Sequence, residues 1–194
     1  MTLFELVFGL SAVILGLALT QIASNFHRLL LAGPRVRWAP DPLLLCAIVF
    51  LVIISVWLTQ WSDRNEIHTT IGMVVLQVLK MLMPYLAAAF VLPDKIAEEG
   101  PIDLYRHYDR TRVFTCGALI AGLLLFWAYY LIAQAGAPAG PPLHWTERLL
   151  AGPWLYIAVY LALIFIRARW FNIVLLTAAL LFYAWQIVPM PLAQ

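Results

Sequence analysis

The chain has 194 residues, of which 64% are hydrophobic and 11% are charged, and its formal net charge is +2. Soluble globular proteins average about 25% charged residues, so this composition excludes an ordinary soluble domain. The positive charge is too small and too scattered for nucleic acid as a partner. We therefore expect an all-α integral membrane protein whose main partner is the lipid bilayer.

Six apolar runs are long enough to be considered as membrane-spanning helices. A helix needs about 20 residues to cross ~30 Å of hydrocarbon, whereas strands of a transmembrane barrel are about ten residues of alternating character. These runs do not alternate, so residues 1–194 are expected to form a single bundle of six transmembrane helices. The fifth is the shortest. The predicted spans are about 3–24, 43–62, 70–92, 113–134, 151–167 and 171–188.

The first run carries small residues at helical spacing, headed by a carboxylate. Gly9, Ala12 and Gly16 follow Glu5 at intervals of three or four residues and share one helix face. Such a face lets another backbone approach closely. We favour helix packing within the bundle, and the alternatives are a homodimer seam or a cavity wall. Glu5 itself is either a hydrated carboxylate at a helix N-terminus or a partner for Lys80.

The second run becomes polar toward its C-terminal end. Ser55 and Thr59 are four residues apart and share a face. Two interpretations remain open, in which these hydroxyls either line an outer vestibule or bond back to carbonyls of their own helix. We favour the back-bonded arrangement, because it is common for Ser and Thr in helices.

The third run contains the most informative pattern. Lys80 lies about ten residues into the run 70–92, so it is roughly 15 Å deep, where a lysine costs ~2.5–3.5 kcal/mol. Pro84 has no N–H to give to the carbonyl of residue 80, and Gln77 lies one turn earlier on nearly the same face. Gln77, Lys80 and Pro84 therefore predict a polar site at mid-membrane depth.

The partner of Lys80 is the main question that this pattern raises. The Cα atoms of Lys80 and Glu5 differ by roughly 10 Å along the membrane normal, so a direct pair is marginal. We expect Gln77, carbonyl groups or water to meet the ammonium group in a cavity open to the outer side. The alternative is that Lys80 is structural, as a buried ion pair or a snorkelling lysine that fixes helix register.

The segment 93–112 is the one sizeable polar stretch between predicted spans. Asp103 is a predicted N-cap for a helix that runs into the fourth span. Asp103, His107 and Asp109 are candidate acid/base groups, but Asp103 and His107 four residues apart are more typical of a solvated helix pair. We interpret the segment as a surface for partner contact.

The loop cations predict the orientation of the bundle. The segments after spans one, three and five hold most of the twelve Lys and Arg residues, and these are Arg28, Arg35, Arg37, Lys95, Arg106, Arg110, Arg112, Arg167 and Arg169. The opposite side holds Arg64 and Arg148. Because cytoplasmic loops are enriched in Lys and Arg, both termini are predicted outside the cytoplasm, in a cell membrane of the bacterial inner-membrane type.

Enzyme signatures are absent from the sequence. It contains no HExxH, no GxSxG, no phosphate-binding GxxxxGK[ST] and no GxGxxG motif. Two cysteines, Cys46 and Cys116, are expected to be free thiols, and neither a metal site nor a cofactor is predicted. The leading hypothesis is a small oligomeric carrier or channel for an ion or small solute. The alternative is an accessory, assembly or sensor subunit that acts through the 93–112 segment, with Lys80 structural.

Overall fold

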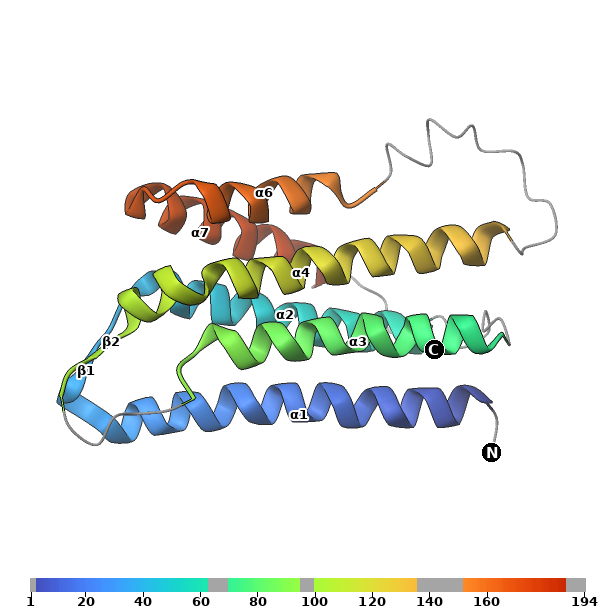
Figure 1. Ribbon diagram of the computed structural model, residues 1–194, viewed down its shortest axis with the longest axis horizontal. Helices are drawn as coiled ribbons and strands as arrows, with labels where there is room; N and C mark the ends of the chain where they lie inside the picture. The colour runs from blue at the N-terminus through green and yellow to red at the C-terminus, as the bar shows by residue number, and fades with distance from the viewer. Residues whose placement is uncertain (1–2, 63–69, 95–99, 136–151, 188–194) are drawn as a thin grey trace.

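We describe a computed structural model of the chain, covering residues 3–62, 70–94, 100–135 and 152–187. Long helices dominate it and lie side by side (Figure 1). Between α1 and α2 lie a short 3-10 turn, Gly33–Arg35, and the strand β1, and the strand β2 directly precedes α4. In chain order the helices and strands are α1 Leu3–Ala32, β1 Val36–Arg37, α2 Pro40–Ser62, α3 Ile71–Val91, β2 Ile102–Asp103, α4 Leu104–Ala135, α6 Trp154–Phe165 and α7 Arg169–Ile187.

Four of the described helices, α1 to α4, are long and apolar enough to cross a membrane. This agrees with the first four predicted spans. The helix at the predicted span 151–167 is shorter than expected, because α6 has 12 residues and rises about 18 Å, less than ~30 Å of hydrocarbon. Helix α7 has 19 residues, close to the predicted 171–188.

Helix α1 is longer than the predicted span 3–24, and its last turns replace part of the expected loop. Leu29 is fully buried there, and the Asn25 side chain donates to the carbonyl of Leu92 at 3.4 Å. Arg28 donates to the carbonyl of Asp94 at 2.9 Å. These contacts satisfy acceptors just beyond the C-terminal end of α3, where intrahelical donors run out. The helix ends where Gly33 adopts a positive φ of 55° before Pro34.

A pair of short strands joins the connection between α1 and α2 to the connection between α3 and α4. Val36 pairs with Ile102 and Arg37 with Asp103 in parallel register. The Asp103 carboxylate also accepts from the backbone N–H of Arg106 at 3.1 Å, which confirms the predicted N-cap. The α1–α2 and α3–α4 connections are therefore held together by backbone hydrogen bonds.

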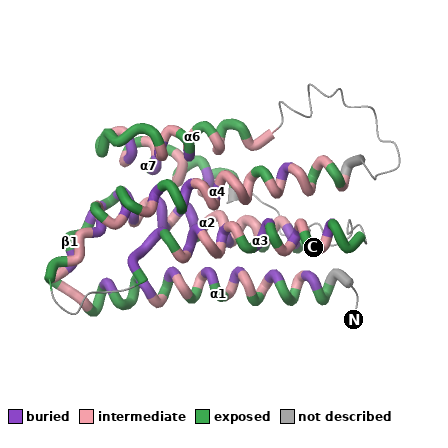
Figure 2. The backbone as a smooth tube through the Cα atoms, viewed as in Figure 1, coloured by how far each residue is buried: buried purple, intermediate pink, exposed green. Residues whose placement is uncertain are grey.

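Helix α3 is central to the packing, in contact with α1, α2 and α4, while α7 packs on α2 and α6 packs on α4. Figure 2 shows buried residues on the facing sides of these helices and exposed residues on their outer sides. The exposed side chains include many large apolar ones, such as Leu31, Phe114 and Trp170. An apolar exterior of this kind is what contact with lipid requires.

Candidate functional site: a cavity beside Lys80

A cavity of about 220 Å³ lies among α2, α3, α4, α6 and α7. Its walls are mainly apolar, with Val52 and Val56 on α2 and Leu119 and Leu123 on α4. Gly122 also lines the cavity, and its lack of a side chain lets α3 and α4 approach closely, because an added Cβ would come to 3.2 Å from the Met83 Cβ.

Lys80 supplies a charged group to this cavity from a buried position. Its side chain is only 4% exposed, and it lines the cavity together with Pro84. The ammonium nitrogen lies 4.3 Å from the centre of the Tyr129 ring and 5.0 Å from that of Phe126. Both distances are within the range of cation–π attraction. Residues 126 and 129 are three apart on α4 and so share a face toward α3.

The predicted neighbours of Lys80 are placed differently from one another. Pro84 lies inside α3, which continues through it as a helix, and it lines the cavity. Gln77 is also buried, but it is not among the described residues that line the cavity. Within the described part of the chain, its Oε1 atom has no hydrogen-bond partner. The amide therefore adds an acceptor near the site rather than to its wall.

Tyrosines from α6 and α7 form the opposite wall. The hydroxyls of Tyr160 and Tyr183 share a hydrogen bond of 3.0 Å in a buried position, and both residues line the cavity. Nearer the helix ends, the Tyr156 hydroxyl donates to Gln186 Oε1 at 2.5 Å, in an exposed position. One tyrosine pair is thus inside the bundle, while the Tyr156–Gln186 pair is at its edge.

Ser55 and Thr59 bond back to carbonyls of their own helix, which is the arrangement favoured from the sequence, and an outer vestibule stays a prediction. Ser55 donates to the Val52 carbonyl at 2.9 Å, and Thr59 donates to the Ser55 carbonyl at 2.8 Å. Both residues nevertheless line the cavity. Because their hydrogens are used within the helix, their hydroxyl oxygens can serve a ligand as acceptors only.

Glu5 and the small-residue face of α1 lie away from this site. Glu5 is exposed in the first turn of α1 and is not among the described residues that line the cavity. Among the described residues, a Cβ built on Gly9 or Gly16 would meet nothing within 4 Å, and Ala12 is half-buried. Packing within the chain instead uses another face, on which Val7, Ser11, Leu15, Ala18 and Ile22 are buried. Packing at Gly9, Ala12 and Gly16, whether within one chain or with a second copy, stays a prediction.

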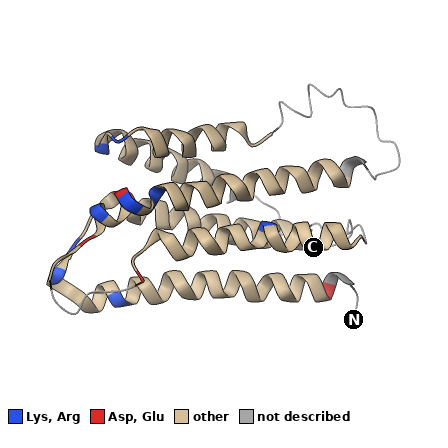
Figure 3. Cartoon of the chain, viewed as in Figure 1, with Lys and Arg blue, Asp and Glu red and all other residues tan. Residues whose placement is uncertain are grey.

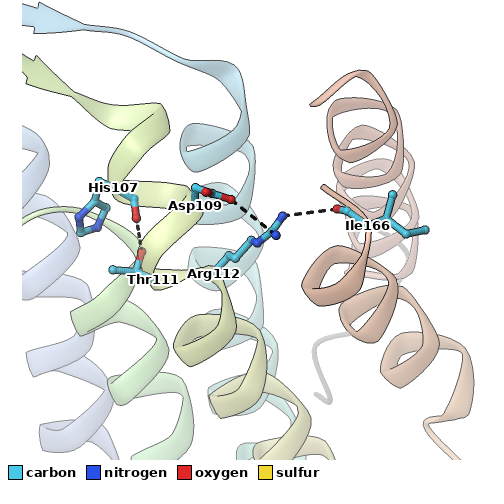
Figure 4. Close-up of polar contacts among 5 residues, drawn as sticks. All are labelled: His107, Asp109, Thr111, Arg112 and Ile166. Atoms are coloured by element: carbon cyan, nitrogen blue, oxygen red, sulfur yellow. Dashed lines mark hydrogen bonds and ion pairs between the residues drawn. The ribbon is translucent and has the colours of Figure 1, made fainter. Parts of the chain in front are cut away.

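A second polar cluster lies near the charged end of the bundle. Asp41 is fully buried at the start of α2, and its Oδ2 lies 3.7 Å from Arg169 Nε. Arg112 is 3% exposed and reaches both Asp109, at 3.5 Å, and the Ile166 carbonyl, at 3.4 Å (Figure 4). Its guanidinium thus holds the α6–α7 connection against α4.

Five buried polar atoms in this cluster have no hydrogen-bond partner among the described residues, namely both carboxylate oxygens of Asp41, the Tyr108 hydroxyl, the Arg112 Nε and the Asn172 Oδ1. His107, one of the candidate acid/base groups, makes a 3.1 Å hydrogen bond with the Phe90 carbonyl through Nε2. With Asp103 serving as a helix cap, His107 and Asp103 have structural contacts that explain their presence. The described residues hold no group of three or more His, Cys, Asp or Glu placed to bind a metal. Cys46 and Cys116 are buried free thiols, as expected.

Sequence reasoning located Lys80 but not the groups that surround it. Phe126, Tyr129, Tyr160 and Tyr183 were each interpretable as ordinary aromatic residues of apolar helices. The available signal was weak, since it consists of aromatic residues at spacings of three or four in two different helices. No protein-family model, curated protein or solved structure matches the chain.

Proposed function

We propose that the chain is a six-span membrane protein that acts as a small carrier for an ion or small solute, bound beside Lys80. The observation that carries this proposal is the cavity at the middle of the bundle, with a buried ammonium group in its wall. Lys80 is the tenth residue of the 21-residue helix α3, so it is about 15 Å from either end. Ionisable groups at such depth are expensive and usually belong to a site.

The position of the cavity favours a carrier over an open channel. Its lining residues on α4 are Ala118, Leu119, Gly122, Leu123 and Phe126, and they lie beyond the first turns of that helix. The described residues at the charged end, including Arg112, are not part of the lining. Among the described residues the lining therefore extends from the middle of the bundle toward the end away from Arg112, and transfer to the other side requires a second conformation.

Six spans with both termini outside the cytoplasm are part of the same proposal. Among the described residues, Lys and Arg gather at one end of the bundle, apart from the one in α3 (Figure 3). This asymmetry favours the charged end as cytoplasmic. Because α6 is short, its span would need residues before Trp154 to complete it.

The topology is tested with single cysteines in a background where Cys46 and Cys116 are replaced by Ala. We expect cysteines at Thr2 and Gln194 to react with an impermeant thiol reagent on intact cells, and one at Ala97 to react only after lysis. The reverse pattern would contradict the orientation and leave the cavity itself unaffected.

The transport role is tested with purified protein in liposomes. We expect Lys80→Met to insert normally and to abolish solute flux, and Lys80→Arg to alter it, because the charge is held beside the cavity. Arg110→Met, an exposed cation on α4, is the matched control and keeps wild-type flux. Equal flux from Lys80→Met and wild type for every ion and solute tested would contradict a role for this cavity.

An accessory or assembly subunit that acts through 93–112 is the second candidate. The observation that favours it is the tying of this segment to the α1–α2 link, through the β1–β2 pair and a 3.3 Å hydrogen bond from Arg35 to the Gly100 carbonyl. Residues 95–99 lie outside the described part of the chain. This function predicts that charge reversal at Arg106 and Arg110 impairs assembly with a partner, whereas Lys80→Met does not.

A further inference from the structure

The geometry points to a small organic monoanion, with an apolar body and one carboxylate, as the ligand of the cavity beside Lys80. We propose this class on the basis of the proposed function, because it assumes that the cavity binds a solute. Three properties of the lining carry the inference, namely its volume, the sign of its charge and the donor of its tyrosine pair.

The volume selects a small ligand with an apolar part. About 220 Å³ is below the ~300 Å³ typical of pockets for drug-sized molecules. It exceeds the ~150 Å³ of an engineered apolar cavity in another protein that binds benzene, so a single ring with one polar group fits. A chloride ion would leave most of the apolar walls at Val52, Val56 and Leu123 uncovered. Water in that space would meet few polar partners.

The charge selects an anion. Lys80 is the one charged side chain among the described residues that line the cavity. Its ammonium group already lies over the rings of Phe126 and Tyr129, which are the aromatic faces that an organic cation would otherwise use. A cation in the cavity would also be repelled by Lys80 in a poorly screened environment. An anion is instead attracted, and the surrounding apolar walls strengthen that attraction.

The hydrogen-bond inventory selects an acceptor that can take two bonds. The Tyr160 and Tyr183 hydroxyls have two hydrogens between them, and their mutual bond uses one. The other hydrogen can be donated into the cavity. A carboxylate accepts from this hydroxyl and from the Lys80 ammonium at once, whereas an alcohol lacks the charge. Ser55 and Thr59 offer acceptors only and do not compete for this role.

The path of entry is at the end of the bundle away from the charged cluster. Thr59 is near the C-terminal end of α2, Tyr156 is the third residue of α6, and Gln186 is next to last in α7. All three line the cavity. The exposed hydrogen bond from Tyr156 to Gln186 lies across this edge. A ligand entering here would reach the Tyr160–Tyr183 pair and then Lys80.

The test is a binding measurement on the full chain in lipid nanodiscs, by calorimetry, with three probes of one shape. These are benzoate, benzyl alcohol and benzylamine, and sodium chloride is measured alongside. We expect benzoate to bind at least tenfold more tightly than the other two probes. We expect Lys80→Met to lose tenfold or more of the benzoate affinity without weakening benzyl alcohol, and Lys80→Arg to retain benzoate binding.

A second variant keeps the test decisive if Lys80→Met fails to insert. The double variant Tyr160→Phe/Tyr183→Phe removes both cavity hydroxyls while keeping the rings, and we expect about a tenfold loss of benzoate affinity, because the hydrogen bond to a charged acceptor is then lost. Tyr130→Phe, on an exposed tyrosine of α4 outside the cavity lining, is the matched control and keeps wild-type affinity.

The outcomes separate this inference from the proposed function. Benzyl alcohol or benzylamine binding as tightly as benzoate would overturn the anion class while leaving a solute-binding cavity in place. Binding of chloride alone, or flux in liposomes without binding of any probe, would likewise overturn the class and keep the carrier. Benzoate affinity unchanged by Lys80→Met and by Tyr160→Phe/Tyr183→Phe would place its site elsewhere and overturn the inference. Absence of all binding and of all flux would overturn both proposals.

Discussion

Replacement of Lys80 by methionine separates a lysine kept for function from one kept for stability. Methionine retains most of the apolar stem that is buried against α4 and removes the ammonium group. The contacts with Phe126 and Tyr129 are lost, and so is the cost of holding a charge 4% exposed at the middle of the bundle. The sign of the change in stability depends on which of these is larger.

The two terms are similar in size. Two cation–π contacts contribute about 1 to 4 kcal/mol together, at about 0.5–2 kcal/mol each. A lysine at the centre of a membrane helix costs about 2.5–3.5 kcal/mol. We therefore expect Lys80→Met to change the free energy of unfolding by between a loss of about 1.5 and a gain of about 2.5 kcal/mol. A lysine required for stability would instead cost about 3–5 kcal/mol when its partner charge is left buried.

The assay is reversible unfolding in mixed micelles, followed by loss of helical circular dichroism. A double-mutant cycle with Phe126→Leu measures the ring contribution directly, and we expect a coupling of about 0.5–2 kcal/mol. Destabilisation by more than about 3 kcal/mol, partly rescued by Glu5→Gln, would refute the reasoning and identify Lys80 as a structural ion pair.

Three further predictions concern the rest of the bundle. Gln60 donates to the Ser11 hydroxyl at 2.8 Å in a buried position, so a cycle of Ser11→Ala and Gln60→Leu is expected to give a coupling of about 0.6 kcal/mol in micelle unfolding, and a coupling of zero would contradict the bond. Gly16→Leu is expected to leave the unfolding midpoint of the monomer unchanged, because an added Cβ meets no described residue within 4 Å. A lower midpoint would contradict this expectation. A change in oligomer size by light scattering would indicate a contact between copies. Arg112→Met is expected to destabilise the protein by about 1.5–3 kcal/mol, because the charged hydrogen bond to the α6–α7 connection is lost. Arg110→Met, at an exposed position, is expected to change stability by less than about 0.5 kcal/mol. Equal effects of the two substitutions would contradict a stabilising role for the Arg112 hydrogen bond.

Local properties of the chain were predictable from sequence. The four long apolar helices, the depth of Lys80 in α3 and the cap at Asp103 depend on residues within a few turns of each other, and the structure agrees with them. The extent of α1 was not predictable in the same way. Its last turns pass the end of the apolar run and are held by contacts of Asn25 and Arg28 beyond the end of α3, far away in sequence.

The face of a helix that packs inward was decided by tertiary structure. In a chain with an apolar exterior, side chains toward lipid and toward the bundle are alike, so hydrophobic periodicity does not distinguish them. Gly9 and Gly16 gave a regular pattern that faces outward, whereas Ser11 and Ala18, on another face of the same helix, are buried. Small residues indicate that close approach is allowed, and only the neighbouring helices determine whether it occurs.

The candidate site divides along the same line. The sequence alone determined that Lys80 lies near the middle of α3, one turn before Pro84, because helix rise and proline geometry are local properties. The tertiary structure alone placed Phe126 and Tyr129 beneath the ammonium group and brought Tyr160 and Tyr183 to the opposite wall. These groups come from three helices separated by long stretches of chain, and their meeting depends on how α4, α6 and α7 pack against α3 and α2, a non-local property that no pattern within a single helix encodes.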